Sequence, residues 1–295
     1  MLRKNITECQ RLFHGRGKFY KDFEHLSIDW YPPVIVITLY KPEEDDHVRL
    51  WANALKEQLP ECRSIFVQYR FQHKAPSELL WGEALDKTIV SENGLKYHIE
   101  LGRAQNCGLF LDMYNGRDWL KKHASGKSVL NLFAYTCAFS DAALAGGAKR
   151  VINVDNNKGV LKRGRENHLL NELDVRSAVF ESVNIFRSFS RIKKYAPYDL
   201  IVCDPPSYQV GSVDITRDYK KIVSRVPQWL KPGGELMLCF NSPHYTEQFL
   251  LELVAETCPQ CAFVEQINPP AVFKESELGR GLKVLIFCYS PQKGG

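Results

Sequence analysis

Long hydrophobic runs, low-complexity stretches and internal repeats are all missing from this sequence of 295 residues. No run of eighteen apolar residues occurs, and the first five residues lead into polar ones instead of an apolar signal core. These absences argue against a helical membrane protein and a repeat protein, and they predict a soluble, cytoplasmic chain. Hydrophobic residues make up 44% and charged residues 25%, as in globular domains, and the length predicts two domains.

The sequence also gives little support for a disulfide framework or a metal site. Its nine cysteines are an odd number, and several of them lie inside apolar runs, which predicts free thiols packed in a core within a reducing compartment. The pair Cys258-Pro-Gln-Cys261 could be half of a zinc site or a redox motif. Because no second pair and no Cys–His partner lie at ligand spacing, we predict no metal ion.

The net charge of +5 is modest, but its distribution is uneven. Up to Lys21 six basic residues face one acid, and from Arg187 to Lys231 nine basic residues face four acids. Two local basic surfaces favour a polyanionic partner that is contacted at two places. Ordinary solvated surface lysines and arginines remain the alternative.

The first hundred residues predict a small α+β domain. Val34–Tyr40 is rich in β-branched residues and Arg63–Arg70 alternates apolar and polar residues, so both are expected strands. Between them Val48–Leu59 has apolar residues at helical spacing, and Lys87–Leu101 is an expected hairpin with its turn at Glu92-Asn93-Gly94. The domain is expected to span residues 1–100, with its basic residues available for contact with a polyanion.

Residues 101–295 predict an α/β domain with a parallel sheet. Apolar strands alternate with helical stretches such as Asn157–Asn171, which is the pattern of βαβ units. Two last strands follow without a convincing helix between them, so we expect a Rossmann-like sheet closed by an antiparallel strand pair. The expected strands are Ser128–Phe133, Arg150–Asp155, Arg176–Glu181, Tyr198–Asp204, Glu235–Phe240, Ala262–Ile267 and Lys283–Cys288.

Ligands of such sheets bind beyond the carboxyl ends of the strands, so the residues there are the candidates for chemistry. The first strand runs into Phe133-Ala134-Tyr135-Thr136 and then a helix, where backbone N–H groups and the hydroxyls of Thr136 and Ser140 suit a ligand carboxylate. An ordinary strand-to-helix turn is the alternative. The absence of a G-x-G-x-x-G pattern argues against nicotinamide and flavin cofactors.

The second and third strand ends suit an adenosine. The carboxylate of Asp155, followed by Asn156, can accept hydrogen bonds from both hydroxyls of a ribose, although an ordinary N-capping Asp would look similar. The side-chain oxygen of Asn184, after the third strand, can accept from an adenine amino group.

The fourth strand end carries the most specific signal, Asp204-Pro205-Pro206-Ser207-Tyr208. Two prolines stiffen the backbone and leave carbonyls with no competing N–H, while Asp204 supplies an acceptor and Tyr208 a flat stacking face. Such a set can hold the edge of a planar base and stack on its ring.

These motifs together resemble those of bacterial large-subunit ribosomal RNA methyltransferases that use S-adenosylmethionine, over about residues 20 to 290. Two branches are similar, one acting on carbon five of cytosine and one on nitrogen seven of guanine. The resemblance implies S-adenosylmethionine as cofactor, RNA as partner, and a cofactor pocket lined by Phe110, Arg117, Phe133, Tyr135, Thr136, Asp155, Asn184 and Asp204. An Arg-x-Tyr-Lys stretch of the cytosine branch is matched at Arg217, Tyr219 and Lys220.

Three positions depart from the family pattern. Cys137 stands where a glycine is usual, so either the backbone there avoids a positive φ or the side chain faces a tolerant space. Asn184 replaces an aspartate, which keeps an acceptor but loses the charge. Asn241 stands where the cytosine branch has a nucleophilic cysteine, and the guanine branch also has asparagine there.

Asn241 bears on the type of reaction. Carbon five of cytosine needs covalent activation by a thiolate, whereas a ring nitrogen or amino group is itself the nucleophile. Cys239 lies two residues earlier, on the same side of the strand, but packing in an apolar strand is its expected role. We therefore expect direct in-line displacement, with Asp204, Pro205, Tyr208 and Asn241 at the acceptor.

Two other functions remain open from the sequence. The chain could methylate a protein or a small molecule, or it could bind S-adenosylmethionine and RNA without catalysis, as the changes at Cys137 and Asn184 suggest.

Overall fold

The computed structural model describes residues 6–102, 106–206 and 215–291, with side chains from residue 217 onward in the last range. The chain divides into two compact units. The first comprises Met1–Asp112 with Pro270–Glu277, and the second comprises Met113–Pro269 with Leu278–Gly295. The sequence suggested a boundary at residue 100, and it did not indicate that a segment near the C-terminus joins the first unit.

The first unit is built on a five-stranded sheet with the order β1-β2-β3-β4-β5. Only β3 and β4 pair in parallel, and α1 forms the crossover between them. A separate antiparallel hairpin, β6–β7, follows in the chain. The elements are β1 (Gln10–His14), β2 (Leu26–Tyr31), β3 (Val34–Leu39), α1 (Asp45–Gln58), β4 (Ser64–Tyr69), β5 (Ser77–Gly82), β6 (Lys87–Glu92) and β7 (Leu95–Glu100), with a short 3-10 turn, η1, at Gly15–Gly17.

The predicted elements of this unit are confirmed to within a few residues. The apolar stripe of α1, formed by Val48, Ala52 and Leu55, packs in one core with β2, β3 and β4. In the hairpin, Asn93 and Gly94 have φ values of 50° and 74°. A two-residue turn with positive φ at both positions matches the twist of the strands, and Asn-Gly is the sequence that adopts it most readily.

The second unit is built on a seven-stranded sheet with the order β10-β9-β8-β11-β12-β14-β13. The first five of these strands are parallel, and β14 pairs antiparallel with both β12 and β13. The predicted Rossmann-like sheet with an antiparallel terminal strand pair is thus confirmed. Its strands are β8 (Ser128–Leu132), β9 (Arg150–Asp155), β10 (Ala178–Ser182), β11 (Tyr198–Cys203), β12 (Leu230–Asn241), β13 (Cys261–Ile267) and β14 (Leu282–Tyr289).

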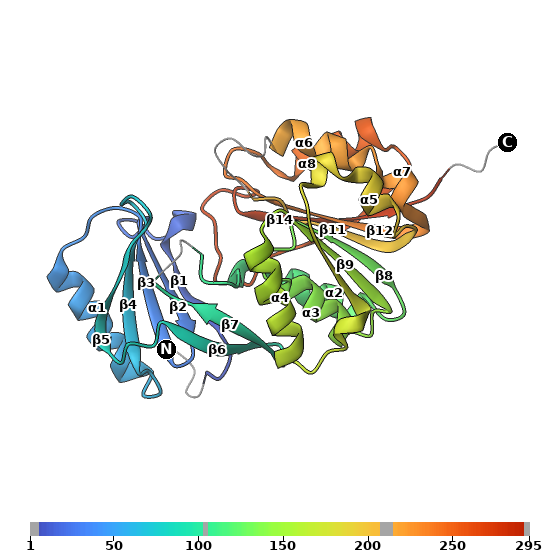
Figure 1. The fold of residues 1–295 in the computed structure, drawn as a ribbon. Coiled ribbons are helices and arrows are strands. Elements are labelled where there is room, and N and C mark those ends of the chain that lie inside the picture. Colours follow the sequence, from blue (N-terminus) through green and yellow to red (C-terminus); the bar gives the residue numbers. More distant parts are fainter. Residues whose placement is uncertain (1–5, 103–105, 207–214, 292–295) are drawn as a thin grey trace. The chain divides into compact units, whose positions relative to one another are not determined.

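Helices cover both faces of this sheet (Figure 1). Side chains of α2 and α3 pack with one face, and side chains of α5, α6, α7 and α8 pack with the other. The helices are α2 (Tyr114–His123), α3 (Ala138–Ala145), α4 (Lys158–Leu170), α5 (Phe189–Lys193), α6 (Ile215–Val223), α7 (Val226–Trp229) and α8 (Glu247–Thr257), with 3-10 turns η2 (Leu111–Met113), η3 (Val175–Ser177) and η4 (Ile185–Arg187). Among the described residues, none of these helices combines the length and the apolar character needed to cross a bilayer.

Two strands differ from their predicted limits by more than one residue. The third strand was expected at Arg176–Glu181, but β10 begins at Ala178 because Asp174 accepts a hydrogen bond from the N–H of Arg176 and caps the turn η3. The fifth strand was expected at Glu235–Phe240, but β12 already begins at Leu230, which pairs with Tyr198 of β11 across an irregularity in the register.

Candidate active site

The polar residues predicted from the strand ends lie along one edge of the second sheet. Strands β10, β9, β8, β11 and β12 are parallel neighbours in that order, so their carboxyl ends lie side by side. Asn184 follows β10, Asp155 ends β9, Asp204 follows β11, and Asn241 ends β12. Because adjacent strands are about 4.8 Å apart, the ends of β9 and β11, on either side of β8, are separated by about 10 Å.

Asp155 is fixed by the backbone of the two loops beside it. Its Oδ2 accepts a hydrogen bond from the N–H of Tyr135 (2.9 Å), and its Oδ1 accepts from the N–H of Asn157 (2.9 Å). A carboxylate oxygen has two acceptor directions, so each oxygen can take one more donor. The half-buried carboxylate is therefore oriented to accept from a pair of neighbouring hydroxyls.

The loop after β8 has an unusual backbone. Phe133, Tyr135 and Cys137 have φ values of 58°, 48° and 62°, while Ala134 and Thr136 between them do not have positive φ. Non-glycine residues with positive φ are uncommon, and they cluster where a backbone is held for ligand binding. The loop ends in α3, whose first helical hydrogen bond is donated by the N–H of Asp141 to Cys137 O. The N–H groups of the three residues before Asp141 precede this first helical bond.

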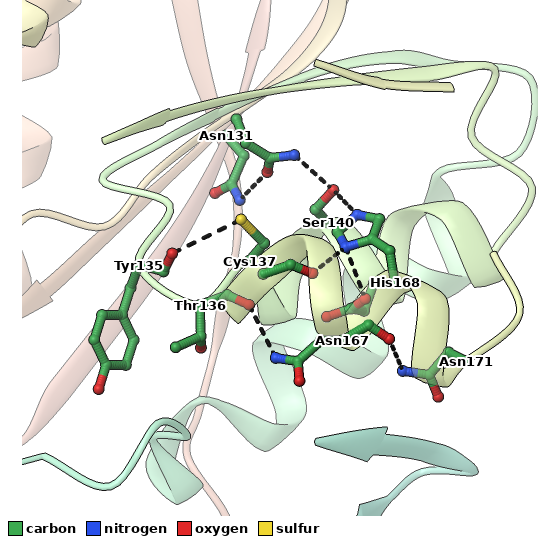
Figure 2. A network of polar contacts seen from close by, with 11 residues as sticks. Asn131, Tyr135, Thr136, Cys137, Ser140, Asn167, His168 and Asn171 are labelled. Carbon is green, nitrogen blue, oxygen red and sulfur yellow. Dashed lines mark hydrogen bonds and ion pairs between the residues drawn. The ribbon is translucent and has the colours of Figure 1, made fainter. Parts of the chain in front are cut away.

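A chain of buried polar side chains supports this loop from within the unit (Figure 2). Asn131 and Asn153 are register partners on β8 and β9, and Asn131 Nδ2 donates to Asn153 Oδ1 (2.9 Å). Asn153 Nδ2 donates to Ser140 Oγ (3.0 Å), which lies 2.9 Å from His168 Nε2 of α4. Asn167 Nδ2, also on α4, donates to Thr136 O (3.2 Å).

The protonation of His168 follows from its neighbours. Its Nδ1 lies 2.7 Å from Gly164 O, and a carbonyl can only accept, so Nδ1 carries the proton and Nε2 accepts from the Ser140 hydroxyl. Burial lowers the pKa of His168, which favours this neutral form. Asp141 lies 3.2 Å from the same Nδ1 and is fully buried, and burial raises the pKa of its carboxyl.

Ser140 consequently has a different role from the predicted one. The side chain is completely buried and its hydroxyl is engaged by His168 and Asn153. The expectation that this hydroxyl contacts a ligand is therefore revised, and Ser140 holds the loop to α4 and β9 instead. Thr136 is also buried, with 4% of its surface exposed.

The conformation of Cys137 decides between the two possibilities that the sequence left open, an avoided positive φ or a tolerant space for the side chain. The backbone does not avoid a positive φ, because Cys137 has a φ of 62°, and its side chain is accommodated by Gly164 of α4. A Cβ added to Gly164 would lie 2.4 Å from Cys137 Sγ, so the absence of that atom creates the space for the thiol. Burial raises the pKa of Cys137, which keeps the thiol protonated and unreactive.

Tyr219 links the ends of β11 and β12, beside the residues predicted to contact the methyl acceptor. The residue is buried on α6, and its hydroxyl contacts the carbonyl oxygens of Cys203, before Asp204, and of Cys239 on β12. Half-buried Asp204 follows directly, with its N–H 3.5 Å from Leu132 O. The Arg-x-Tyr-Lys stretch thus places its tyrosine beneath the Asp-Pro-Pro turn.

The end of β12 separates Asn241 from Cys239. Asn241 is exposed at the last strand position, whereas Cys239 has no exposed surface and packs in the core on the α2 and α3 side of the sheet. The loop that follows is held by Lys283 of β14, whose Nζ donates to the carbonyl oxygens of Ser242 (2.6 Å) and Tyr245 (2.7 Å). Arg280 donates to Pro243 O of the same loop (2.7 Å).

Comparison with known proteins decides the family. A model described as S-adenosylmethionine-dependent methyltransferase matches residues 10–288. The chain belongs to the S-adenosylmethionine-dependent methyltransferase family. Over 239 residues it is 30% identical to ribosomal RNA large subunit methyltransferase I of Aeromonas salmonicida, covering 78% of this chain and 60% of that relative, so it spans less than two thirds of the relative's length.

Two solved structures are similar over nearly the whole chain. A protein described as a SAM-dependent methyltransferase from Streptococcus mutans has a TM-score of 0.86 and 26% identity, covering 97% of this chain and 76% of its own. The structure of the methyltransferase SMU.776 complexed with SAH has a TM-score of 0.86 and 26% identity, covering 96% and 76%. The cofactor of the family is S-adenosylmethionine, of which SAH is the demethylated form.

The remaining predicted site residues belong to both units. Arg117 is buried on α2, Asn156 is exposed after β9, and the Oδ1 of exposed Asn184 accepts from the N–H of Arg187 (3.2 Å). Phe110 belongs to the first unit and has 43% of its surface exposed. Tyr208 lies outside the described residues. The direct ligand contacts of these residues stay predictions.

The thiol pair near the C-terminus lies in the second unit. The sulfur atoms of Cys258 and Cys261 are 3.3 Å apart and both residues are buried, and none of the nine cysteines, all within the described ranges, is in a disulfide. Within the described ranges, no group of three or more His, Cys, Asp or Glu side chains is arranged to hold a metal ion.

The supporting network was not predicted from the sequence. Asn131 and Asn153 each interrupt an otherwise apolar strand, in Val-Leu-Asn-Leu and Val-Ile-Asn-Val, and such interruptions are the signal that was available. A polar residue inside a buried strand needs a partner, because burying an unpaired amide is unfavourable. His168 and Gly164 gave no comparable signal, since both look ordinary in a helix.

Proposed function

We propose that the chain transfers the methyl group of S-adenosylmethionine to a nucleobase of RNA, and that large-subunit ribosomal RNA is the substrate. The order of groups along the sheet edge carries the proposal: Asn184 for adenine, Asp155 for ribose, the β8 loop for methionine, and Asp204 with Asn241 for the acceptor. The name of the Aeromonas salmonicida relative supports ribosomal RNA as the substrate. The free thiols are consistent with a cytoplasmic enzyme.

The residues present fit the cofactor. Asp155 keeps one acceptor direction on each oxygen for the two ribose hydroxyls, and the start of α3 offers N–H groups to the methionine carboxylate. Phe133 and Tyr135 are half-buried on the same loop and provide apolar contact area. Bound S-adenosylmethionine supplies an activated methyl group on a sulfonium sulfur.

The acceptor side is proposed to align the base. Asp204 accepts from an amino or ring N–H group of the base, Pro205 stiffens the turn that presents it, and Tyr208 stacks on the ring. Asn241 can both donate to and accept from the base edge. The acceptor atom of the base then reacts by direct in-line displacement, without a covalent bond to the protein, because buried Cys239 is committed to the core.

Asp204 provides the test. Purified protein is titrated with S-adenosylmethionine and SAH in a thermal-shift assay, and transfer of radiolabelled methyl to large-subunit RNA is then measured, with modified nucleosides identified by mass spectrometry. We expect wild type to be stabilised by both ligands, by about 2.7 kcal/mol at a ligand concentration of one hundred times Kd, and to label the RNA. Asp204→Ala should bind SAH but lose at least 100-fold in transfer, because the aligning acceptor is removed. Asp174→Ala, which removes an exposed acid that caps η3, is the control: loss of the cap lowers its unfolding temperature, but it should be stabilised by SAH and transfer methyl as wild type does.

The outcomes separate the alternatives. Absence of stabilisation by either ligand would contradict the enzyme function altogether. Stabilisation without labelling of RNA would instead favour a protein or small-molecule substrate, or a binding factor without catalysis. An active Asp204→Ala variant would contradict the role of this carboxylate.

A further inference from the structure

The loop between β1 and β2 presents an exposed aromatic surface. We call residues 16–23 the aromatic loop. Phe19, Tyr20 and Phe23 are 53%, 39% and 40% exposed, and their rings form one continuous set with the half-buried rings of Phe13 and Trp51. Ring centroids are separated by 5.3 Å for Phe19–Tyr20, 5.0 Å for Phe13–Tyr20, 6.0 Å for Phe13–Phe23 and 6.2 Å for Phe23–Trp51. Single exposed hydrophobic residues are common on protein surfaces, whereas a cluster of exposed rings is characteristic of a contact surface.

The backbone of the aromatic loop is fixed before any ligand arrives. Lys18 N–H donates to Gly15 O (2.8 Å), and Gly17 O accepts from the N–H of Ser276 (2.7 Å) in the segment Pro270–Glu277 of the same unit. A Cβ at Gly17 would lie 1.8 Å from Lys274 O, so only glycine allows this close approach. A surface ordered in advance loses little conformational entropy on binding.

Positive charge surrounds these rings. Within the aromatic loop, exposed Arg16, Lys18 and Lys21 face a single acid, Asp22. The Nζ of Lys274 lies 5.2 Å from the centre of the Phe19 ring. One nearby acid, Glu275, already contacts another side chain, because its Oε1 lies 3.4 Å from His14 Nε2. This excess of positive charge therefore favours a polyanion as the ligand over a protein surface that is neutral or has few acidic residues.

Two guanidinium groups converge beside the loop. The Cζ atoms of Arg16 and Arg70 lie 4.0 Å and 5.9 Å from the centre of the same ring, Tyr40. Burial lowers the pKa of Arg70, and the positive charge of Arg16 lowers it further, so the two cations repel each other. A phosphate bound between them would relieve that repulsion.

We propose that the aromatic loop binds an unpaired stretch of RNA, with bases stacked on Phe19 and Tyr20 and phosphates on Arg16, Lys18 and Lys274. Stacking requires open base faces, which a single strand offers and a duplex covers. The inference rests on the proposed function and deepens it: the substrate carries single-stranded nucleotides outside the target site, and this unit binds them.

Binding of oligouridine provides the test. Fluorescein-labelled twelve-nucleotide oligouridine is titrated with the full chain, alone and annealed to oligoadenosine, at several salt concentrations. Phe19→Ala should weaken binding of the single strand about tenfold, whereas Phe19→Tyr should change it less than twofold, because a stacking face is kept. Phe263→Ala on β13, which removes an equally exposed ring (49%) of the second unit, is the matched control and should leave binding unchanged. Arg16→Ala should reduce the slope of log affinity against log salt by about one.

The inference and the proposed function fail in different ways. The same variants are assayed for methyl transfer to large-subunit RNA, where Phe19→Ala should raise KM for the RNA about tenfold. If wild type labels RNA but Phe19→Ala retains its affinity and KM, the stacking surface is refuted while the proposed function stands. Equal affinity for duplex and single strand would also refute the stacking surface. So would a second result, in which oligouridine does not bind and Phe19→Ala abolishes self-association in sedimentation, because a second copy of the chain would then cover the rings. If wild type labels no RNA, the proposed function itself fails.

Discussion

The contact between Cys137 and Gly164 leads to a prediction about the cofactor loop. In Gly164→Ala, the new Cβ would lie 2.4 Å from Cys137 Sγ, 2.7 Å from Cys137 Cβ and 3.2 Å from the backbone carbon of Thr136. Overpacking of this kind costs about 1–3 kcal/mol, and the higher helix propensity of alanine returns about 1 kcal/mol in α4. We therefore expect a net loss of about 1 kcal/mol in the free energy of unfolding.

The double variant separates the clash from other effects. In Cys137→Gly/Gly164→Ala the side chain that Ala would strike is gone, and glycine adopts the φ of 62° without the cost of about 1–2 kcal/mol that other residues bear. The change in the free energy of unfolding of the double variant should be about 2 kcal/mol more favourable than the sum of the changes in the two single variants. Gly159→Ala in the first turn of α4 is the control, because its Cβ would approach only Asn157 Oδ1, at 3.2 Å, and no atom of the loop after β8.

Urea denaturation measures stability, and isothermal titration with SAH measures the effect on the loop. Because the clash pushes on the backbone of Thr136, Gly164→Ala should weaken SAH binding about tenfold, and the double variant should recover most of it. Stabilities that add within about 0.5 kcal/mol, or SAH affinity unaffected by Gly164→Ala, would refute the reasoning.

Three further predictions concern single residues. Asp155→Ala should weaken SAH binding about 100-fold in titration calorimetry, because two charge-assisted hydrogen bonds to the ribose are lost; a change below threefold would contradict its role. Cys239→Ala should methylate RNA at near wild-type rate with a stability loss of about 1 kcal/mol; a folded but inactive variant would restore the cysteine mechanism. Burial raises the pKa of Asp141, so the folded state keeps a proton that the unfolded chain releases above about pH 4, and wild-type stability falls as pH rises from there towards the folded pKa. Urea titrations at a series of pH values from 4 upward should therefore show Asp141→Asn gaining over wild type, by up to about 1.4 kcal/mol per pH unit, until the folded pKa is passed; a constant difference would mean an ionised Asp141 paired with His168.

Local sequence patterns were sufficient for the order of the elements. The β-branched run at Val34–Leu39 and the Asn93-Gly94 turn carry their own conformational preferences, so their prediction needed no partner. The same holds for the strand ends: a polar residue directly after an apolar strand, such as Asp155 or Asp204, is placed at the sheet edge by connectivity alone.

Contacts between distant residues could not be predicted in this way. The conformation of Cys137 depends on the missing Cβ of Gly164, and the role of Ser140 depends on His168 and Asn153, all more than ten residues away in the chain. A hydroxyl at a helix start has the same appearance in sequence whether it faces a ligand or the core, and only burial distinguishes the two.

The sequence by itself determined the α/β class, the antiparallel closing strand pair and the residues at each strand end, because these follow from periodicity and connectivity. Only the tertiary structure decided which of those residues face the edge and which support it, and that the segment Pro270–Glu277 joins the first unit beneath the aromatic loop. Burial and hydrogen-bond partners are properties of packed neighbours, and packing brings together residues whose separation in the chain carries no local signal.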